Sequence, residues 1–160
     1  MAVWAMLGLS LGLVSCGGRG ATTVEAPGLA ACVGQDFGDP KAPVSVEAIL
    51  PVNNGCQDAL GLYLVDLARQ HSSLLHVRVF DMKGLDGRAL MASKGVKCAC
   101  VLVGGATKFD LGGEIGKLLL EGPMDPMDVY NVLQHEVSAV ATSPVVLPKP
   151  PEDCSAPSAE

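Results

Sequence analysis

Aromatic side chains and positive charge are both scarce in this chain. Phe, Trp and Tyr make up 4% of the 160 residues, and 11 Lys and Arg stand against 17 Asp and Glu, for a net charge of −6. Proteins that bind nucleic acids rely on basic surfaces and on aromatic side chains that stack on bases. We therefore expect no nucleic-acid partner. Apolar residues make up 49% and charged residues 18%, which is typical of a folded domain and excludes a disordered chain.

Charge is absent altogether from residues 1–15, which read MAVWAMLGLSLGLVS. As a helix this stretch would rise about 22 Å, less than the roughly 30 Å hydrocarbon core of a bilayer. It is therefore interpreted as a signal peptide, although only the α-amine, and no Lys or Arg, precedes the apolar run.

The end of this stretch, Leu13-Val-Ser-Cys16 followed by two glycines, resembles the bacterial lipobox. The resemblance implies that Cys16 receives a lipid and becomes the new N-terminus. The protein would then be anchored by lipid to a membrane of the cell envelope, on its periplasmic or extracytoplasmic face. The alternatives are ordinary cleavage and an uncleaved anchor, with Cys16 a chance cysteine.

The composition divides the rest of the chain into three parts. Residues 16–37 are rich in Gly, Ala and Thr and are predicted to form a flexible tether after the lipidated cysteine. Residues 38–140 are predicted to form one folded domain. Residues 141–160 contain five prolines and are predicted to be an extended, disordered tail that is mostly unpacked.

Hydrophobic periodicity predicts alternating strands and helices within 38–140. Leu60, Leu64 and Leu67, for example, fall on one helical face, Asn53 or Asn54 could cap that helix, and Asp125 could cap the last one. Strands are expected at 44–50, 74–80, 100–103, 108–111 and 117–120, and helices at 56–71, 86–94 and 125–137. This order predicts a small α/β sandwich with a mixed sheet.

Three segments resemble the thioredoxin-like fold. The stretch 38–43, GDPKAP, is similar to the lead-in of periplasmic disulfide oxidoreductases. The turn Asn53-Asn-Gly-Cys56 takes the place of the family's Cys-x-x-Cys and keeps only its second cysteine. The stretch 95–102, GVKCACVL, is similar to the loop that ends in the family's cis-proline, with Cys100 at the proline position. The resemblance implies a thioredoxin-like sandwich with a mixed central sheet and flanking helices, and it places Gly61 where thioredoxins usually have a kinking proline.

In such a fold Cys56, Cys98 and Cys100 would share one surface. Cys56 would start a helix, where the helix dipole favours a thiolate, and could pair with Cys98 or Cys100 while the third thiol resolves the reaction. This hypothesis describes a redox or redox-sensing protein that acts on protein thiols or disulfides without a cofactor. As an enzyme it would be an atypical oxidoreductase, because the first cysteine of the motif is Asn53.

Two other readings of these three cysteines stay open. Three thiolates suit Cu(I) or, with a fourth ligand, Zn²⁺, so Cys56, Cys98 and Cys100 could form the metal site of a non-enzymatic binding module. The same scaffold could instead bind a protein partner and keep its cysteines for structure. A direct Cys98–Cys100 bond is disfavoured, since Cα atoms two apart in a strand lie about 6.6 Å from each other, near the limit for a disulfide.

Cys32 and Cys154 flank the predicted domain. They would either form a disulfide that closes a long loop or remain two unpaired thiols in the tails. Of the six cysteines, five remain after lipidation of Cys16, so at least one is left without an intramolecular partner. This cysteine content is typical of an oxidising compartment or of metal or redox chemistry.

Overall fold

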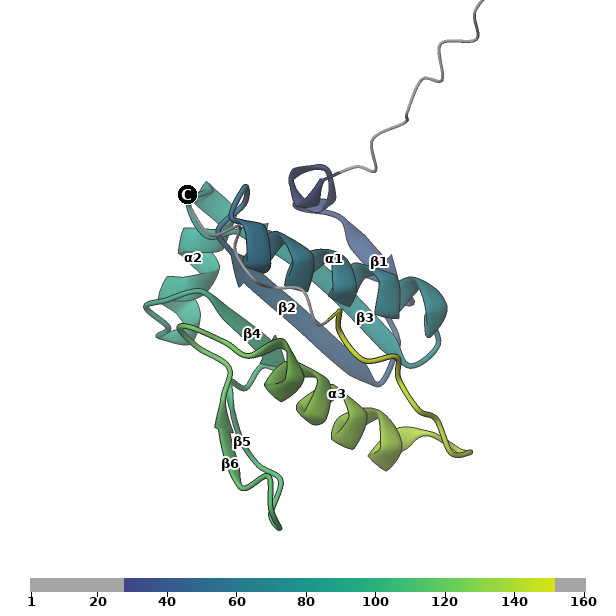
Figure 1. The fold of residues 1–160 in the computed structure, drawn as a ribbon. Helices are drawn as coiled ribbons and strands as arrows, with labels where there is room; N and C mark the ends of the chain where they lie inside the picture. Colours follow the sequence, from purple (N-terminus) through teal and green to yellow (C-terminus); the bar gives the residue numbers. More distant parts are fainter. Residues whose placement is uncertain (1–27, 152–160) are drawn as a thin grey trace, which may run out of the picture.

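A mixed four-stranded sheet forms the centre of the computed structural model, which describes residues 28–151 (Figure 1). The strands lie in the order β1 (Asp36–Gly38), β3 (Leu75–Asp81), β2 (Val44–Leu50), β4 (Cys100–Val103). β2 and β3 are parallel, while β1 pairs with β3 and β4 pairs with β2 in the antiparallel sense. The predicted α/β class with a mixed sheet is confirmed. The predicted signal peptide and the lipidation of Cys16 lie outside the described residues.

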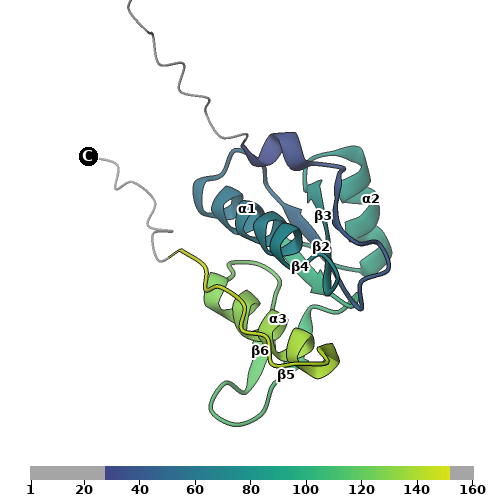
Figure 2. The same cartoon turned by 90° about the vertical axis from the view of Figure 1, so that its right-hand side faces the viewer.

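Helices cover both faces of the sheet. α1 (Gly55–Gln70) and α3 (Pro126–Val140) pack on one face, and α2 (Leu85–Lys94) packs on the other (Figure 2). Alternate residues of β2 divide between the two cores. Val46, Ala48 and Leu50 join the large core under α1 and α3, whereas Ile49 joins a small core under α2. Across residues 28–151, no helix combines the length and the apolar content that a bilayer crossing needs.

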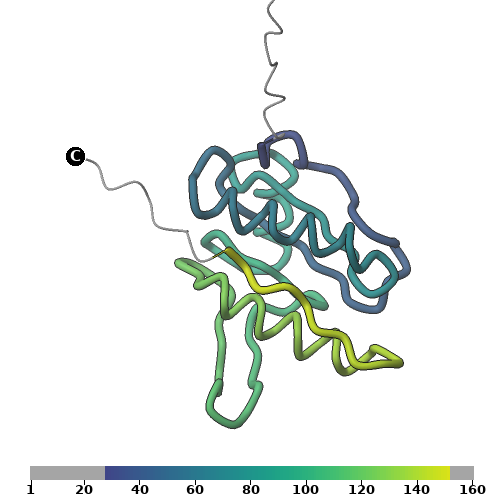
Figure 3. Tube along the Cα trace, turned by 45° about the vertical axis from the view of Figure 1, so that its right-hand side comes forward, coloured from purple at the N-terminus to yellow at the C-terminus, as the bar shows by residue number. Residues whose placement is uncertain are grey.

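A two-stranded hairpin, β5 (Lys108–Asp110) and β6 (Lys117–Leu119), forms a separate sheet that projects from the domain (Figure 3). Its return strand then rejoins the main sheet. The N–H of Val101 donates to the carbonyl of Leu120 at 3.0 Å, and the N–H of Gly122 donates to that of Ala99 at 2.8 Å. The strands predicted near 108 and 117 are therefore present, but the return segment reaches the central sheet only through a single bridge at Cys100 and Glu121.

The two predicted helix caps have different outcomes. The Asp125 carboxylate accepts from the N–H of Met127 at 2.8 Å and caps α3, as expected. At the start of α1, Asn54 occupies the N-cap position as expected, but its side chain forms no capping hydrogen bond, and the Asp58 carboxylate binds the backbone before the helix instead. That carboxylate accepts from the N–H groups of Asn53 and Asn54 at 3.0 and 3.1 Å. The two asparagines are therefore fixed through their backbone.

The folded domain begins about nine residues earlier than predicted. A short 3₁₀ helix, η1 (Leu29–Cys32), buries Leu29 and Cys32 in the large core, and β1 forms an edge of the sheet. Residues 29–37 are therefore packed, and the prediction of a flexible tether is wrong for them. Gly61 makes room for this packing, because a Cβ there would lie 2.7 Å from Cδ2 of Leu29 and closer still to Cδ1.

The proline-rich segment after α3 is also packed. From residue 141 the chain is extended and runs back between α3 and α1 (Figures 1 and 3). The Gln134 side chain donates to the carbonyl of Val145 and accepts from the N–H of Leu147, both at 2.8 Å, and Leu147 is fully buried. The prediction of an unpacked tail is therefore wrong for 141–151, while residues 152–160 lie outside the described part.

Tyr63 of α1 binds the proline-rich segment that follows α3. Its hydroxyl donates to the carbonyl of Pro148 at 2.8 Å. Burial, and to a lesser degree the neighbouring Tyr130, raises the pKa of the Tyr63 phenol. The phenol therefore stays protonated and available as a donor across the physiological pH range.

The contact between Leu29 and Gly61 leads to a first prediction. We expect Gly61→Ala to destabilise the protein by about 1 kcal/mol, since an overpacking cost of about 1–3 kcal/mol exceeds the roughly 1 kcal/mol that alanine gains over glycine inside a helix. Urea denaturation of the two proteins measures the difference. In a Leu29→Ala background the obstruction is removed, and the same change should become stabilising. A Gly61→Ala variant that is stabilised in both backgrounds would show that the contact carries no strain.

Candidate functional site

The strand register brings the predicted site segments to one end of the sheet. Cys100 opens β4 and lies opposite Ile49, the second-last residue of β2. After Leu50 the chain turns directly into α1, in which Cys56 is the second residue. The start of α1 and the loop that carries Cys98 therefore lie at the same end of the sheet.

The thiol of Cys100 faces α2 and not α1. Cys100 is buried in the small core with Ile49, Phe80 and Leu102, beneath α2. α1, which carries Cys56, packs on the opposite face of the sheet. To react with Cys56, the Cys100 side chain would have to leave this core.

Cys100 is also held in its neutral form. Burial, followed by the carboxylates of Glu121 and Glu47 and the Cys98 thiol, raises its pKa from 9.0 to about 11. A thiol must lose its proton before it can act as a nucleophile or bind a metal. The structure therefore gives Cys100 the environment of a core side chain.

Cys98 stands in a different environment, two residues earlier. It is exposed, in the loop before β4. This loop is held in place because the backbone N–H of Lys97 donates to a Glu121 carboxylate oxygen at 2.8 Å. Cys98 and Cys100 are both free thiols in the structure, so neither forms a disulfide with the other or with Cys56. Of the two thiols in this loop, Cys98 is the accessible one.

Cys56 is half-buried in the first turn of α1. Asn53, which occupies the position of the missing motif cysteine, has a left-handed backbone with φ of 62°. Asparagine adopts this conformation more readily than most residues. The local backbone therefore gives a structural reason for asparagine at this position.

The remaining cysteine predictions concern metal binding and the tails. Among residues 28–151, no group of three or more His, Cys, Asp or Glu side chains is arranged to hold a metal ion. Metal binding by Cys56, Cys98 and Cys100 thus remains a prediction without a preformed ligand set. Cys32 is a free thiol buried in the large core, and Cys154 lies outside the described residues. The predicted Cys32–Cys154 disulfide therefore stays a prediction.

A cluster of polar side chains lies on the α2 face of the sheet, and the sequence alone did not predict that these residues come together. Asp36 of β1 is hydrogen-bonded to His76 at 2.8 Å and forms an ion pair with Arg78 at 3.1 Å, and Lys94 forms an ion pair with Glu47 at 3.5 Å. His76, Arg78, Lys94 and Glu47 are among the residues that line a cavity of about 340 Å³ here. In the sequence, this cluster is indicated only by the polar residues that alternate with apolar ones in β2 and β3. The paired charges tie β1 to β3 and the end of α2 to β2.

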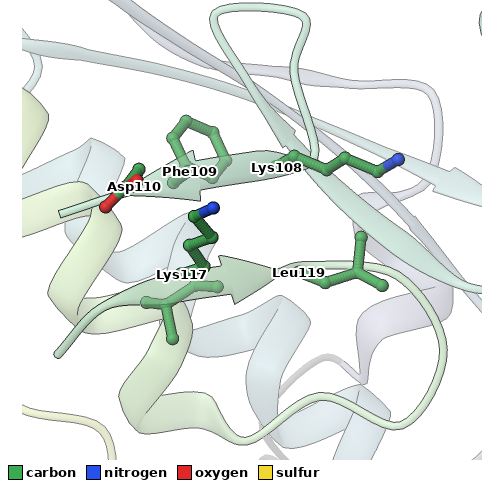
Figure 4. Close-up of a pocket in the computed structure, with 6 residues that line it drawn as sticks. Lys108, Phe109, Asp110, Lys117 and Leu119 are labelled. Atoms are coloured by element: carbon green, nitrogen blue, oxygen red, sulfur yellow. The ribbon is translucent and has the colours of Figure 1, made fainter. Parts of the chain in front are cut away.

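A second hollow of about 350 Å³ lies over the β5–β6 hairpin (Figure 4). It is lined by Lys108, Phe109, Asp110, Lys117, Leu118 and Leu119. The lining is mainly apolar and contains no thiol, histidine or paired carboxylates. It therefore offers a contact surface of apolar and charged side chains.

The environment of Cys100 leads to a second prediction, on pH. Because its pKa is raised on folding, the unfolded chain loses this proton near pH 9 and the folded chain near pH 11. The stabilisation is complete below pH 9 and is lost as the pH rises to 11, by about 1–3 kcal/mol. Urea denaturation at several pH values should show a larger loss in the natural protein and in Cys98→Ala than in Cys100→Ala, in which the raised pKa of Tyr63 still lowers stability at the upper end of this range. Identical pH profiles for all three proteins would contradict the assignment.

Comparison of the chain with family models, with curated proteins and with solved structures finds no match in any of the three. No residue therefore receives a role from a relative. The roles of Cys56, Cys98 and Cys100 must therefore be inferred from their positions in the structure and from the sequence.

Proposed function

We propose that this chain is a lipid-anchored, thioredoxin-like protein of the bacterial cell envelope that performs thiol–disulfide exchange or redox sensing through Cys56. The order of the elements supports the fold. A parallel strand–helix–strand unit, β2-α1-β3, is followed by α2, the antiparallel β4, a hairpin and α3, with helices on both faces of the sheet. That is the order expected of a thioredoxin-like sandwich.

The observation that carries the redox proposal is the shared sheet end of α1 and the Cys98 loop. A half-buried thiol at a helix start and an exposed thiol in a loop at the same end of the sheet are suited to two successive exchange steps. The Cys56 thiolate attacks a disulfide of a protein substrate, forms a mixed disulfide and releases one substrate thiolate. The Cys98 thiolate then attacks Cys56 Sγ and releases the second. The substrate disulfide is reduced while Cys56 and Cys98 are oxidised, and the reverse sequence oxidises a dithiol.

Cys100 takes no direct part in these two exchange steps. Its burial and its raised pKa make it the least reactive of the three predicted thiols. It could act only after α2 or the start of β4 moves. Our proposal therefore favours Cys98 over Cys100 as the resolving thiol.

The proposed location depends on the sequence before residue 28. Lipid on Cys16 would add about 0.8 kcal/mol of membrane affinity for each buried methylene group. Disulfide exchange also suits an oxidising envelope compartment better than the cytosol. Radiolabelled palmitate incorporation, lost in Cys16→Ser, tests this part of the proposal by itself.

Thiol reactivity tests the redox proposal. We expect iodoacetamide to alkylate Cys56 selectively in the native protein at mildly acidic pH, and we expect Cys56 to cycle between oxidised glutathione and a dithiol reductant. Cys56→Ser should abolish the cycling, and Cys32→Ser, which removes a thiol buried elsewhere, should leave it unchanged. If Cys56 and Cys98 react only after denaturation, the redox proposal is wrong.

The second candidate is a non-enzymatic binding module for a protein partner or a soft metal. Asn53 in place of the motif cysteine and the buried Cys100 favour it, because both reduce the number of reactive thiols. Its metal form predicts Cu(I) or Zn²⁺ bound stoichiometrically in protein purified without oxygen, and lost in Cys98→Ser/Cys100→Ser. Protein that neither contains nor takes up either ion would remove the metal form.

A further inference from the structure

The projecting hairpin has open strand edges. Among residues 28–151, β5 pairs with β6 alone, and the two strands form a sheet of their own that stands away from the domain (Figures 1 and 3). β5 reads Lys108-Phe-Asp110, with both charged residues exposed and Phe109 half-buried between them (Figure 4). The N–H and C=O groups along an open edge can pair with a further strand.

The hydrogen bonds at the two ends of β5 show which of its backbone groups are open. The carbonyl of Thr107 and the N–H of Leu111 both bond to the returning side of the hairpin, at 2.8 and 2.9 Å. Because this direction alternates along an antiparallel strand, Phe109 also directs its backbone groups toward β6. Lys108 and Asp110 therefore direct their N–H and C=O groups to the open edge.

Two copies of β5 fit each other in one antiparallel register. With Phe109 of one copy opposite Phe109 of the other at a two-fold axis, each Lys108 lies opposite Asp110 of the other copy. Both residues have open backbone groups, so each of the two pairs forms two backbone hydrogen bonds. Opposite charges directly across two strands also attract. One Asp110 oxygen accepts from the N–H of Gly112 at 3.2 Å, and a carboxylate has further lone pairs for an ammonium group.

Other arrangements of two hairpins lack this match. A parallel pair in register would place Lys108 opposite Lys108 and Asp110 opposite Asp110, which repel. The open edge of β6 has Lys117 and Leu119 in the equivalent positions, and they form no charge pair with each other. Charged residues usually protect an edge strand from pairing. Those of β5 therefore oppose every register except the antiparallel one centred on Phe109.

We propose that the open edge of β5 binds β5 of a second copy of this chain, so that two hairpins form one four-stranded sheet across a two-fold axis. The self-complementary order of Lys108, Phe109 and Asp110 carries this inference, which is independent of the proposed redox function. A three-residue strand provides a small interface, so the dimer is weak and forms at high protein concentration.

Reversal of single charges tests the proposal. Lys108→Glu places carboxylates opposite each other in both pairs, and Asp110→Lys does the same with ammonium groups. Both side chains are exposed, so each variant should fold. We expect the association constant of the full chain, from sedimentation equilibrium in density-matched detergent, to fall about 30-fold in each variant. Lys83→Glu makes the same change of net charge at an exposed position before α2 and should leave the constant unchanged.

A mixture of the two variants tests the register itself. Each variant repels its own copies, but Lys108→Glu and Asp110→Lys complement each other, because both cross-strand pairs then join a carboxylate to an ammonium group. We expect the equimolar mixture to recover an association constant within about threefold of that of the natural protein. Proximity of the two chains in any other register would give no such recovery.

Three results would overturn the proposal. Natural protein that stays monomeric up to about 1 mM would leave the β5 edge to a different partner. A dimer equally stable in the natural protein and in both variants would place the contact elsewhere in the chain. A mixture that does not recover the dimer would exclude the antiparallel register. None of these changes involves Cys56 or Cys98, so thiol exchange by the same variants tests the redox function separately.

Discussion

Replacing Gly87 with alanine is expected to destabilise the protein by about 2 kcal/mol or more. Gly87 lies in the first turn of α2, where a Cβ would lie 2.8 Å from the carbonyl carbon of Asp81 and still closer to its oxygen. Both are backbone atoms at the end of β3, so no side chain can rotate away. α2 must move off the sheet, and this cost exceeds the roughly 1 kcal/mol that alanine gains over glycine in a helix.

Urea denaturation measures this effect, with Arg88→Ala as the control. Arg88 is the next residue of the same helix and is exposed, so its replacement should change the free energy of unfolding by no more than about 0.5 kcal/mol. A displaced α2 should also uncover Cys100 and make its thiol react with maleimide in the native variant. If Gly87→Ala is as stable as Arg88→Ala, α2 does not approach β3 as closely as described.

Leu147→Ala is expected to cost about 3 kcal/mol, within the usual range of about 2–5 kcal/mol for a buried leucine. Leu147 is 1% exposed, although it lies in a segment whose composition is typical of an unpacked tail. Its neighbour Val146 is 80% exposed and provides the matched control. Val146→Ala should leave the free energy of unfolding within about 0.5 kcal/mol of the natural protein.

Leu147→Met tests whether the loss is one of volume. Methionine has nearly the volume of leucine, and we expect it to restore stability to within about 1.5 kcal/mol. Equal and small effects of Leu147→Ala and Val146→Ala would show that the segment after α3 is not packed.

The strands and helices were predictable wherever the apolar pattern was continuous. β2 and β4 have the bounds that the sequence predicts, since β2 alternates apolar and polar residues before it becomes fully apolar and β4 is a short apolar run. Burial of β4 on both faces, however, leaves no alternation in its sequence. The sequence therefore could not predict which face of the sheet Cys100 lies on. That face determines whether the Cys100 thiol is accessible.

The two ends of the domain were missed for a different reason. Each is held by a few residues that contact a distant helix, with no periodic pattern of its own. Leu29 depends on the missing side chain of Gly61, a residue that the sequence presented only as a helix weakener. Leu147 depends on the amide of Gln134. Contacts of this kind link residues far apart in the chain, so a single sequence contains no local signal for them.

The attachment of both ends of the described domain to α1 has a mechanical consequence. Leu29 packs at Gly61 and Pro148 binds at Tyr63, two positions on nearly opposite sides of the helix. Tension applied between the ends of the described domain would therefore load α1 at both contacts, while the bridge from Val33 to Val79 passes part of the force to the central sheet. The proposed reactive thiol begins that same helix, so pulling on the chain at either end would alter the surroundings of Cys56.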